Sequence, residues 1–245
     1  MSSVSVTTHD FVVVSVQTVA FLADRILSPS RIMASVLKSY ADLYDGEIQA
    51  LPLPPDVPAE LPRVILQSAD QRFRFEAGPA RISSTWQYQD DDREVLSSIT
   101  SRCREVLVHC LGELKPRVGR LALVITRARP TEHPAQILVE QFCNSNSQSE
   151  PFNRSSNFEI HNHKQYTPSQ SDPKLTINSW VRCKTGTLTK NNSPAILVEQ
   201  DLNTLAEDLE RNRFDAASTT AFFDLTVQEA DSILKKYFPG ETSCP

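Results

Sequence analysis

The amino-acid sequence predicts an α+β fold: a mainly antiparallel sheet with its helices packed on one side. Three observations predict this class. Runs of β-branched residues, such as the one from Phe11 to Val16, are typical of buried strands. Apolar residues recur at helical spacing between such runs. The order strand-helix-strand-strand-helix-strand in the first half is that of a ferredoxin-like unit, whose sheet is usually antiparallel.

Residues 1–130 form the predicted ferredoxin-like half. Its first strand is expected over residues 4–20. A helix should begin at Ser28 and Pro29 and end near Gly46, because serine caps helices and proline suits their first turn. Five prolines make residues 51–62 an extended connector. The other strands expected in this half cover residues 63–68, 71–77, 81–89 and 118–128.

A long helix is expected before the last of these strands. Its apolar stripe includes Cys103 and Cys110, which we interpret as core thiols. The acidic residues Asp90, Asp91 and Asp92 precede it. Carboxylates at this position are stabilised by the positive end of the helix dipole. We therefore interpret the acidic run as helix capping and not as a metal site.

Residues 131–157 form a predicted connecting segment, and residues 158–245 form a related β-β-β-α half of the same compact unit. Within the connecting segment, residues 133–142 suit either a short helix or a docking strand. Residues 144–157 are rich in Ser, Asn and Gln, which is typical of a flexible loop.

Three strands and two helices are expected in the second half. The strands cover residues 158–166, 175–187 and 195–201. The helices are expected over residues 213–223 and 226–238. Thr226 and Glu229 have the spacing of a capping box, which predicts that the second helix begins there.

Composition argues against several classes of protein. The six glycines are isolated, so no glycine-rich loop is available to hold a phosphate, and we expect neither a P-loop NTPase nor a bound cofactor. Five cysteines without a C-x-x-C pair predict no disulfide framework and no zinc site, which favours the cytoplasm. The longest apolar run is too short for a signal peptide or a membrane span, so no membrane partner is expected.

His161 and His163 are the candidate catalytic residues. Residues two apart in a strand project to one face, so the two imidazoles would be able to flank a phosphate or share a metal. No third ligand is evident, and no metal site is therefore predicted. Asp201 and Asn203 are interpreted as turn or capping residues after a strand.

A face of the sheet that carries arginines and aromatic side chains is the candidate binding site. Such a face holds single-stranded nucleic acid in some proteins, but here the chain has a net charge of -5. The alternative is a solvated face with cross-strand ion pairs. The candidate binding residues are Arg72, Arg74, Trp86, Trp180 and Arg182.

Several segments also resemble a known family. They are residues 73–86, the helix after Asp92, residues 118–129, residues 175–182, residues 196–204 and the terminal helix. The chain resembles a sporadically distributed bacterial family of uncharacterised proteins, with a β-α-β-β-α-β half followed by a strand-rich half and a C-terminal helix. The resemblance implies this fold and an accessory role, such as phage defence.

The function predicted from the sequence is that of a non-catalytic binding or adaptor protein, because no complete set of acid, base and nucleophile is evident. It would recognise another macromolecule: another protein or a second copy first, with single-stranded nucleic acid as an open alternative. The other class considered is a phosphodiester-directed or metal-dependent, nuclease-like enzyme that uses His161 and His163.

Overall fold

The computed structural model places nine strands in one sheet that spans both halves of the chain. It describes residues 6–24, 28–52, 54, 56–89, 94–143, 155–169, 175–188 and 192–239. The strands are β1 (Val12–Leu22), β2 (Ile48–Ala50), β3 (Val64–Gln67), β4 (Phe73–Ala77), β5 (Arg81–Gln87), β6 (Val118–Pro130), β7 (Glu159–Tyr166), β8 (Ile177–Thr187) and β9 (Pro194–Thr204). The helices are α1 (Pro29–Tyr40), α2 (Leu96–Leu114), α3 (Pro134–Phe142) and α4 (Ala216–Tyr237).

Every neighbouring pair of strands is antiparallel, in the order β2-β3-β4-β5-β1-β6-β9-β8-β7. The predicted α+β class is therefore confirmed. The first half has the ferredoxin-like arrangement, in which the first strand lies between the strands on either side of the second helix. Between its two helices this half has four strands, β2 to β5, where the ferredoxin-like unit has two.

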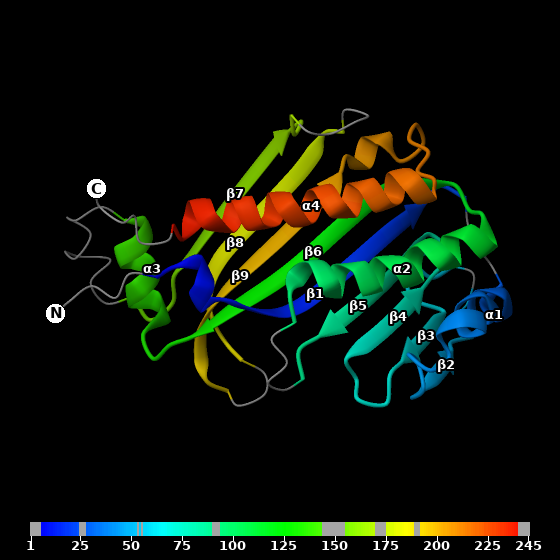
Figure 1. Ribbon diagram of the computed structural model, residues 1–245, viewed down its shortest axis with the longest axis horizontal. Coiled ribbons are helices and arrows are strands. Elements are labelled where there is room, and N and C mark those ends of the chain that lie inside the picture. The colour runs from blue at the N-terminus through cyan, green and yellow to red at the C-terminus, as the bar shows by residue number, and fades with distance from the viewer. Residues whose placement is uncertain are drawn as a thin grey trace.

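The sheet is arranged alike on the two sides of its central pair of strands. β1 and β6 lie side by side, with β5 next outward from β1 and β9 next outward from β6. α2 follows β5 in the chain and α4 comes after β9, so a long helix follows each of these two strands. Figure 1 shows these two helices side by side across the sheet, and they contact each other.

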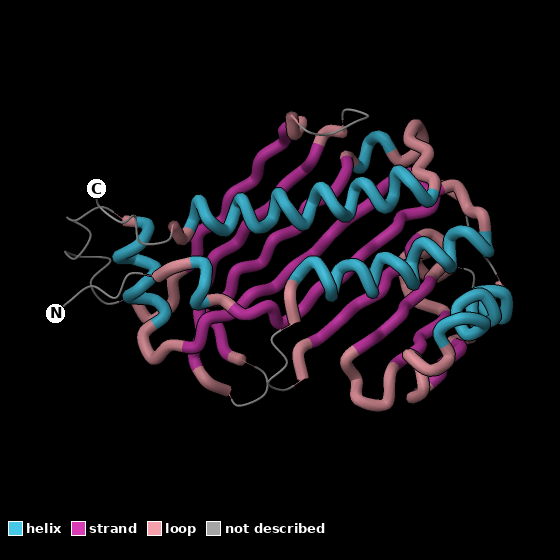
Figure 2. The backbone as a smooth tube through the Cα atoms, in the orientation of Figure 1, coloured by secondary structure: helices cyan, strands magenta, loops and turns pink. Residues whose placement is uncertain are grey.

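The four α-helices of the described residues lie on one face of the sheet, as Figure 2 shows most clearly for α2 and α4. Between these two helices and the sheet, the core includes four fully buried side chains, Val16, Leu123, Phe222 and Phe223. Burying apolar side chains of this size stabilises a fold by about 1.5–3 kcal/mol each. The other face carries no helix among the described residues.

The predicted core thiols are confirmed. Cys103 and Cys110 are both free and buried on the inner side of α2. Burial raises the pKa of Cys103 to about 12. It raises that of Cys110 to about 11, although a hydrogen bond with Ser35 acts in the opposite direction. Neither side chain is therefore a thiolate at neutral pH.

The start of α1 is confirmed. The side chain of Ser28 accepts a hydrogen bond from the backbone N–H of Arg31, and Pro29 is the first helical residue. The start of α2 differs from the prediction, because the helix begins at Leu96 after Val95, which makes no side-chain cap. The acidic run from Asp90 to Asp92 lies outside the described residues, and most of the predicted loop at 144–157 does too.

The predicted capping box at Thr226 and Glu229 is wrong. α4 is one continuous helix, capped by Asp215, whose carboxylate accepts from the backbone N–H of Ser218 at 2.8 Å. Thr226 is buried in mid-helix, where its hydroxyl donates to the Phe222 carbonyl at 2.9 Å. A hydroxyl satisfied within the preceding turn does not interrupt a helix, which is why the sequence motif was misleading.

Three strand bounds also differ from the prediction. β1 begins at Val12, after a short 3₁₀ turn at Thr8–Asp10, and not at residue 4. β2 was not predicted, because three mostly exposed residues leave no periodic pattern. β9 continues to Thr204. Asp201 and Asn203 are thus strand residues and not the turn or cap that was expected.

Candidate functional site

The candidate site is the face of the sheet that the helices leave uncovered, here called the open face. In β8, Ser179, Val181 and Cys183 are buried towards the helices, whereas Trp180 and Arg182 alternate with them and point to the open face. The register carries this alternation across the sheet. On the strands β5, β1, β6 and β9, the open-face residues include Gln17, Phe21, Arg81, Thr85, Arg120, Thr126, Glu199, Asp201 and Asn203.

Ion pairs cross the open face at its β7–β9 end. Arg182 contacts Glu159 on β7 at 2.9 Å and Glu199 on β9 at 3.6 Å. Lys184 contacts the same Glu199 at 2.6 Å. The candidate binding residue Arg182 thus does lie on the open face. Its charge, however, is balanced by neighbouring strands, as in the alternative of a solvated face.

Trp180 is the exposed aromatic residue of this region, at 37% exposed. His163 stacks on its ring with 3.9 Å between centroids and 10° between planes, and His161 lies at 4.8 Å. The two histidines share a face, as the spacing predicted. In the described part of the chain, no group of three or more His, Cys, Asp or Glu side chains is placed to hold a metal.

A chain of amides connects this aromatic cluster to the central strands. His163 Nε2 lies 2.5 Å from Asn178 Oδ1, and the Asn178 amide donates to Asn203 Oδ1 at 3.2 Å. Arg120 donates to the same oxygen at 2.9 Å, and Asn203 donates to Asp201 at 2.9 Å. Asn178 and Arg120 were missed from the sequence, since only the strand register brings them to this position.

Asp201 is an open-face carboxylate whose pKa is shifted by its surroundings. Burial raises its pKa above the usual range, while the hydrogen bond from Asn203 and the charge of Arg120 lower it. The folded state therefore binds this proton more tightly than the unfolded chain does. The group contributes stability at low pH, and that contribution is lost as the pH rises through the raised pKa.

Asp201→Asn is expected to raise the melting temperature at pH 7, because the neutral amide can still accept from Asn203 and avoids the cost of a buried charge. The difference in melting temperature between the variant and the unmodified protein should narrow as the pH falls from 7 towards about 4, because the carboxyl is increasingly protonated there. Thermal unfolding followed by circular dichroism across this range measures both. A variant that is less stable at every pH by the same amount would contradict the assignment.

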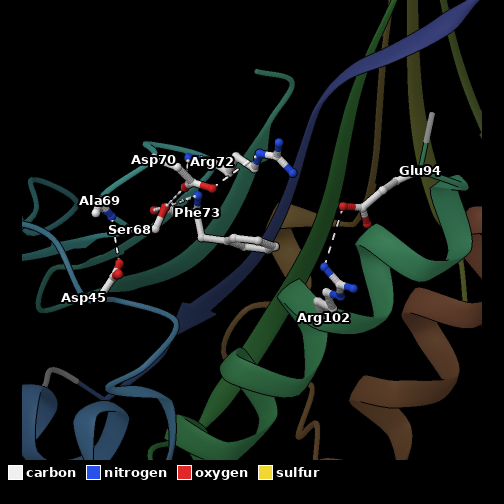
Figure 3. Close-up of polar contacts among 8 residues, drawn as sticks. All are labelled: Asp45, Ser68, Ala69, Asp70, Arg72, Phe73, Glu94 and Arg102. Carbon is white, nitrogen blue, oxygen red and sulfur yellow. Dashed lines mark hydrogen bonds and ion pairs between the residues drawn. The ribbon is translucent and has the colours of Figure 1, made fainter. Parts of the chain in front are cut away.

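Arg72 and Arg74 lie at the β3–β4 end of the sheet. Arg74 forms an ion pair with Glu76 at 2.7 Å. Arg72 lies in the turn before β4, where Asp70 accepts from its backbone N–H at 2.9 Å and contacts its guanidinium at 3.4 Å. Figure 3 shows this turn, with Ser68 bonded to both Asp70 and Phe73. Arg72 is therefore held locally.

Trp86 is the one candidate binding residue that the structure places in the core. It is 1% exposed and lies on the helix side of β5, opposite Phe73 of β4. The expectation that it lies on an exposed face is wrong. Alternation along β5 fixes only that Trp86 and its neighbours point in opposite directions. The helices decide which of the two faces is covered.

The comparisons with known proteins leave the class of protein open. No family model matches the chain, and no curated protein matches it. Among solved structures, it is 11% identical to the crystal structure of the di-domain ARO/CYC StfQ from the steffimycin biosynthetic pathway. The alignment covers 91% of this chain and 97% of that chain with a TM-score of 0.19, and at that score the likeness carries no argument. The resemblance to the sporadic bacterial family stays a prediction.

No helix in the described ranges combines the length and apolar character that are needed to cross a membrane.

Proposed function

We propose that this chain is a non-catalytic binding protein whose open face recognises a protein partner. The observation that carries the proposal is the one-sided covering of the sheet. Helices pack on one face of nine strands, and the described residues of the other face are mostly polar and partly exposed. Binding surfaces between proteins often combine an exposed aromatic residue with fixed charged and amide groups, as Trp180, Arg182 and Asn178 do here.

The mixture of charges favours a protein over a nucleic acid. Four carboxylates occupy open-face positions next to the arginines: Glu76, Glu159, Glu199 and Asp201. A phosphate backbone would meet these carboxylates as well as the cations, at a cost in repulsion. A protein surface, which carries both signs of charge, is able to complement the pattern.

The alternative of a phosphodiester-directed enzyme receives less support from the geometry. His161 and His163 are engaged with the ring of Trp180, and His163 is also engaged with Asn178. A general base needs an acidic or nucleophilic group within hydrogen-bond reach, and no complete set of this kind includes the two histidines among the described residues.

We keep the cytoplasm as the proposed location.

Site-specific photo-cross-linking in the native host tests the proposed surface. A benzophenone side chain at Gln87 or at Thr126 is on the open face, whereas one at Ser232 is on the exposed side of α4. We expect the two open-face positions to yield the same protein adduct and Ser232 to yield none. An adduct from Ser232 alone, or open-face adducts with RNA or DNA, would contradict the proposal.

A further inference from the structure

Two arginines flank one aromatic ring on the open face. Phe21 of β1 lies directly opposite Arg81 of β5 on one side and Arg120 of β6 on the other. The guanidinium carbon of Arg81 lies 6.0 Å from the Phe21 ring centroid, and that of Arg120 lies 4.6 Å from it. Adjacent strands thus place two positive charges within reach of one ring.

Neutral groups hold both guanidinium groups in place. Arg81 donates to the Gln17 side-chain oxygen at 3.2 Å, and Gln17 is itself fixed by donating to Thr85 at 3.1 Å. Arg120 donates to the Thr204 carbonyl at 3.2 Å and to the Asn203 amide oxygen at 2.9 Å. Amide and carbonyl oxygens orient a guanidinium without cancelling its charge.

Neither arginine has a carboxylate within ion-pair distance among the described residues. The charge of Arg120 lowers the pKa of Asp201, and the two side chains are connected through hydrogen bonds with Asn203 and not by an ion pair. The Nε atom of Arg81 is buried and has no hydrogen-bond partner in the same described set. Both guanidinium groups are therefore held by neutral acceptors and form no ion pair within the described residues.

The other cations of the open face differ in this respect. Arg74 has Glu76 at 2.7 Å, and Arg182 and Lys184 share Glu199. Among the described residues, Arg81 and Arg120 are thus the open-face cations that form no ion pair with a carboxylate. Together with Phe21 they are here called the arginine row. An arginine that is already held in position binds a carboxylate in a bidentate manner with little further loss of side-chain freedom.

We propose that the arginine row binds an acidic segment of the protein partner, with one carboxylate on Arg81, another on Arg120 and aliphatic groups of the segment against Phe21. The inference rests on the proposed function, because it names the chemistry of the partner that the open face recognises. A peptide with separate carboxylates matches two guanidinium groups on different strands. A continuous phosphate backbone would also meet Asp201 and Glu199 on β9.

The first experiment uses a hexaglutamate peptide with blocked ends, titrated into the full chain while the arginine Nε–H resonances are followed by NMR. We expect saturable shifts of Arg81 and Arg120. Arg81→Gln and Arg120→Gln should each weaken binding by roughly ten- to hundredfold, the range for one charge-assisted hydrogen-bonding group. Lys184→Gln is the matched control: it removes a cation of the same face whose carboxylate partner, Glu199, still has Arg182, and it should leave binding unchanged.

Circular dichroism must show that each variant is folded, and Arg81→Lys and Arg120→Lys, which keep the charge, should recover part of the affinity. Equal binding by the Arg81→Gln/Arg120→Gln double variant would overturn the inference. So would shifts confined to Arg74 and Arg182, or the absence of saturable binding at millimolar peptide. Hexauridylate binding to the arginine row more tightly than hexaglutamate would assign the site to phosphate instead.

The cross-linking assay separates this inference from the proposed function. The double variant should lose the protein adduct at Gln87 and Thr126 that the unmodified chain forms. If the adduct persists at full yield, the open face still binds a partner but the arginine row does not recognise it. If the unmodified chain forms no adduct at either position, the proposed function itself fails, whatever the peptide titration shows.

Discussion

Trp86→Ala is expected to lower the free energy of unfolding by about 3–5 kcal/mol, the usual loss when a buried large aromatic is truncated. The indole is 1% exposed and belongs to the main core cluster beneath the long helices, where it contacts Tyr88 edge-on at 6.4 Å between centroids. Removing it leaves a cavity that the surrounding strands and α2 cannot fully close.

The second tryptophan of the chain provides the matched control. Trp180 is 37% exposed, and its contacts are cross-strand stacking with two histidines. Trp180→Ala should therefore change stability by less than about 1 kcal/mol, the upper range for a cross-strand pair. Urea unfolding of both variants measures the two losses. Similar losses for both would mean that the sheet face assigned to the helices is wrong.

Gly119→Ala is expected to destabilise the fold by about 3 kcal/mol, at the upper end of the cost of overpacking. Gly119 is in β6, and a Cβ atom there would overlap the carbonyl oxygen of Leu209, which is backbone and not a movable side chain. The segment after β9 packs directly on this strand, since Val118 also pairs with Phe214. The substitution should separate these two segments.

The same substitution at Gly112 should have the opposite effect. Gly112 lies on the exposed side of α2, and a Cβ atom there would meet nothing within 4 Å. Alanine has a higher helix propensity than glycine, so Gly112→Ala should stabilise by up to about 1 kcal/mol. Thermal unfolding compares the pair directly. Destabilisation by Gly112→Ala, or no change from Gly119→Ala, would contradict these two local environments.

The strands that the sequence predicted well are those with long β-branched or alternating patterns. β6 and β8 were expected at 118–128 and 175–187 and are observed at Val118–Pro130 and Ile177–Thr187. The helix over α4 was expected in two pieces, because Thr226 and Glu229 imitate a helix start. A local motif of four residues cannot show whether the preceding turn is already helical, whereas the hydrogen bond from Thr226 to Phe222 does.

The candidate site was predicted in part. The four residues that lie together on β7 and β8 are His161, His163, Trp180 and Arg182. The spacing of two within a strand grouped the histidines, whereas Trp180 and Arg182 were expected as part of a cationic and aromatic sheet face. Arg120 and Asn203 were not found as members of the site, since they come from β6 and β9. Their association depends on the pairing register of β6 with β9, which brings together two residues that are 83 positions apart in the chain. The sequence contains no local signal for such a register.

By itself the sequence determined the α+β class, the antiparallel sheet, the buried thiols of α2 and the residue pairs that share a strand face. These properties follow from periodicity, because a strand alternates every two residues and a helix repeats every 3.6. Only the tertiary structure decided which face of each strand is covered, and so why Trp86 is buried while Trp180 is exposed. It also decided which arginines form an ion pair with a carboxylate. Both depend on long-range packing of helices and strands, in which side chains distant in the chain compete for the same face of the sheet.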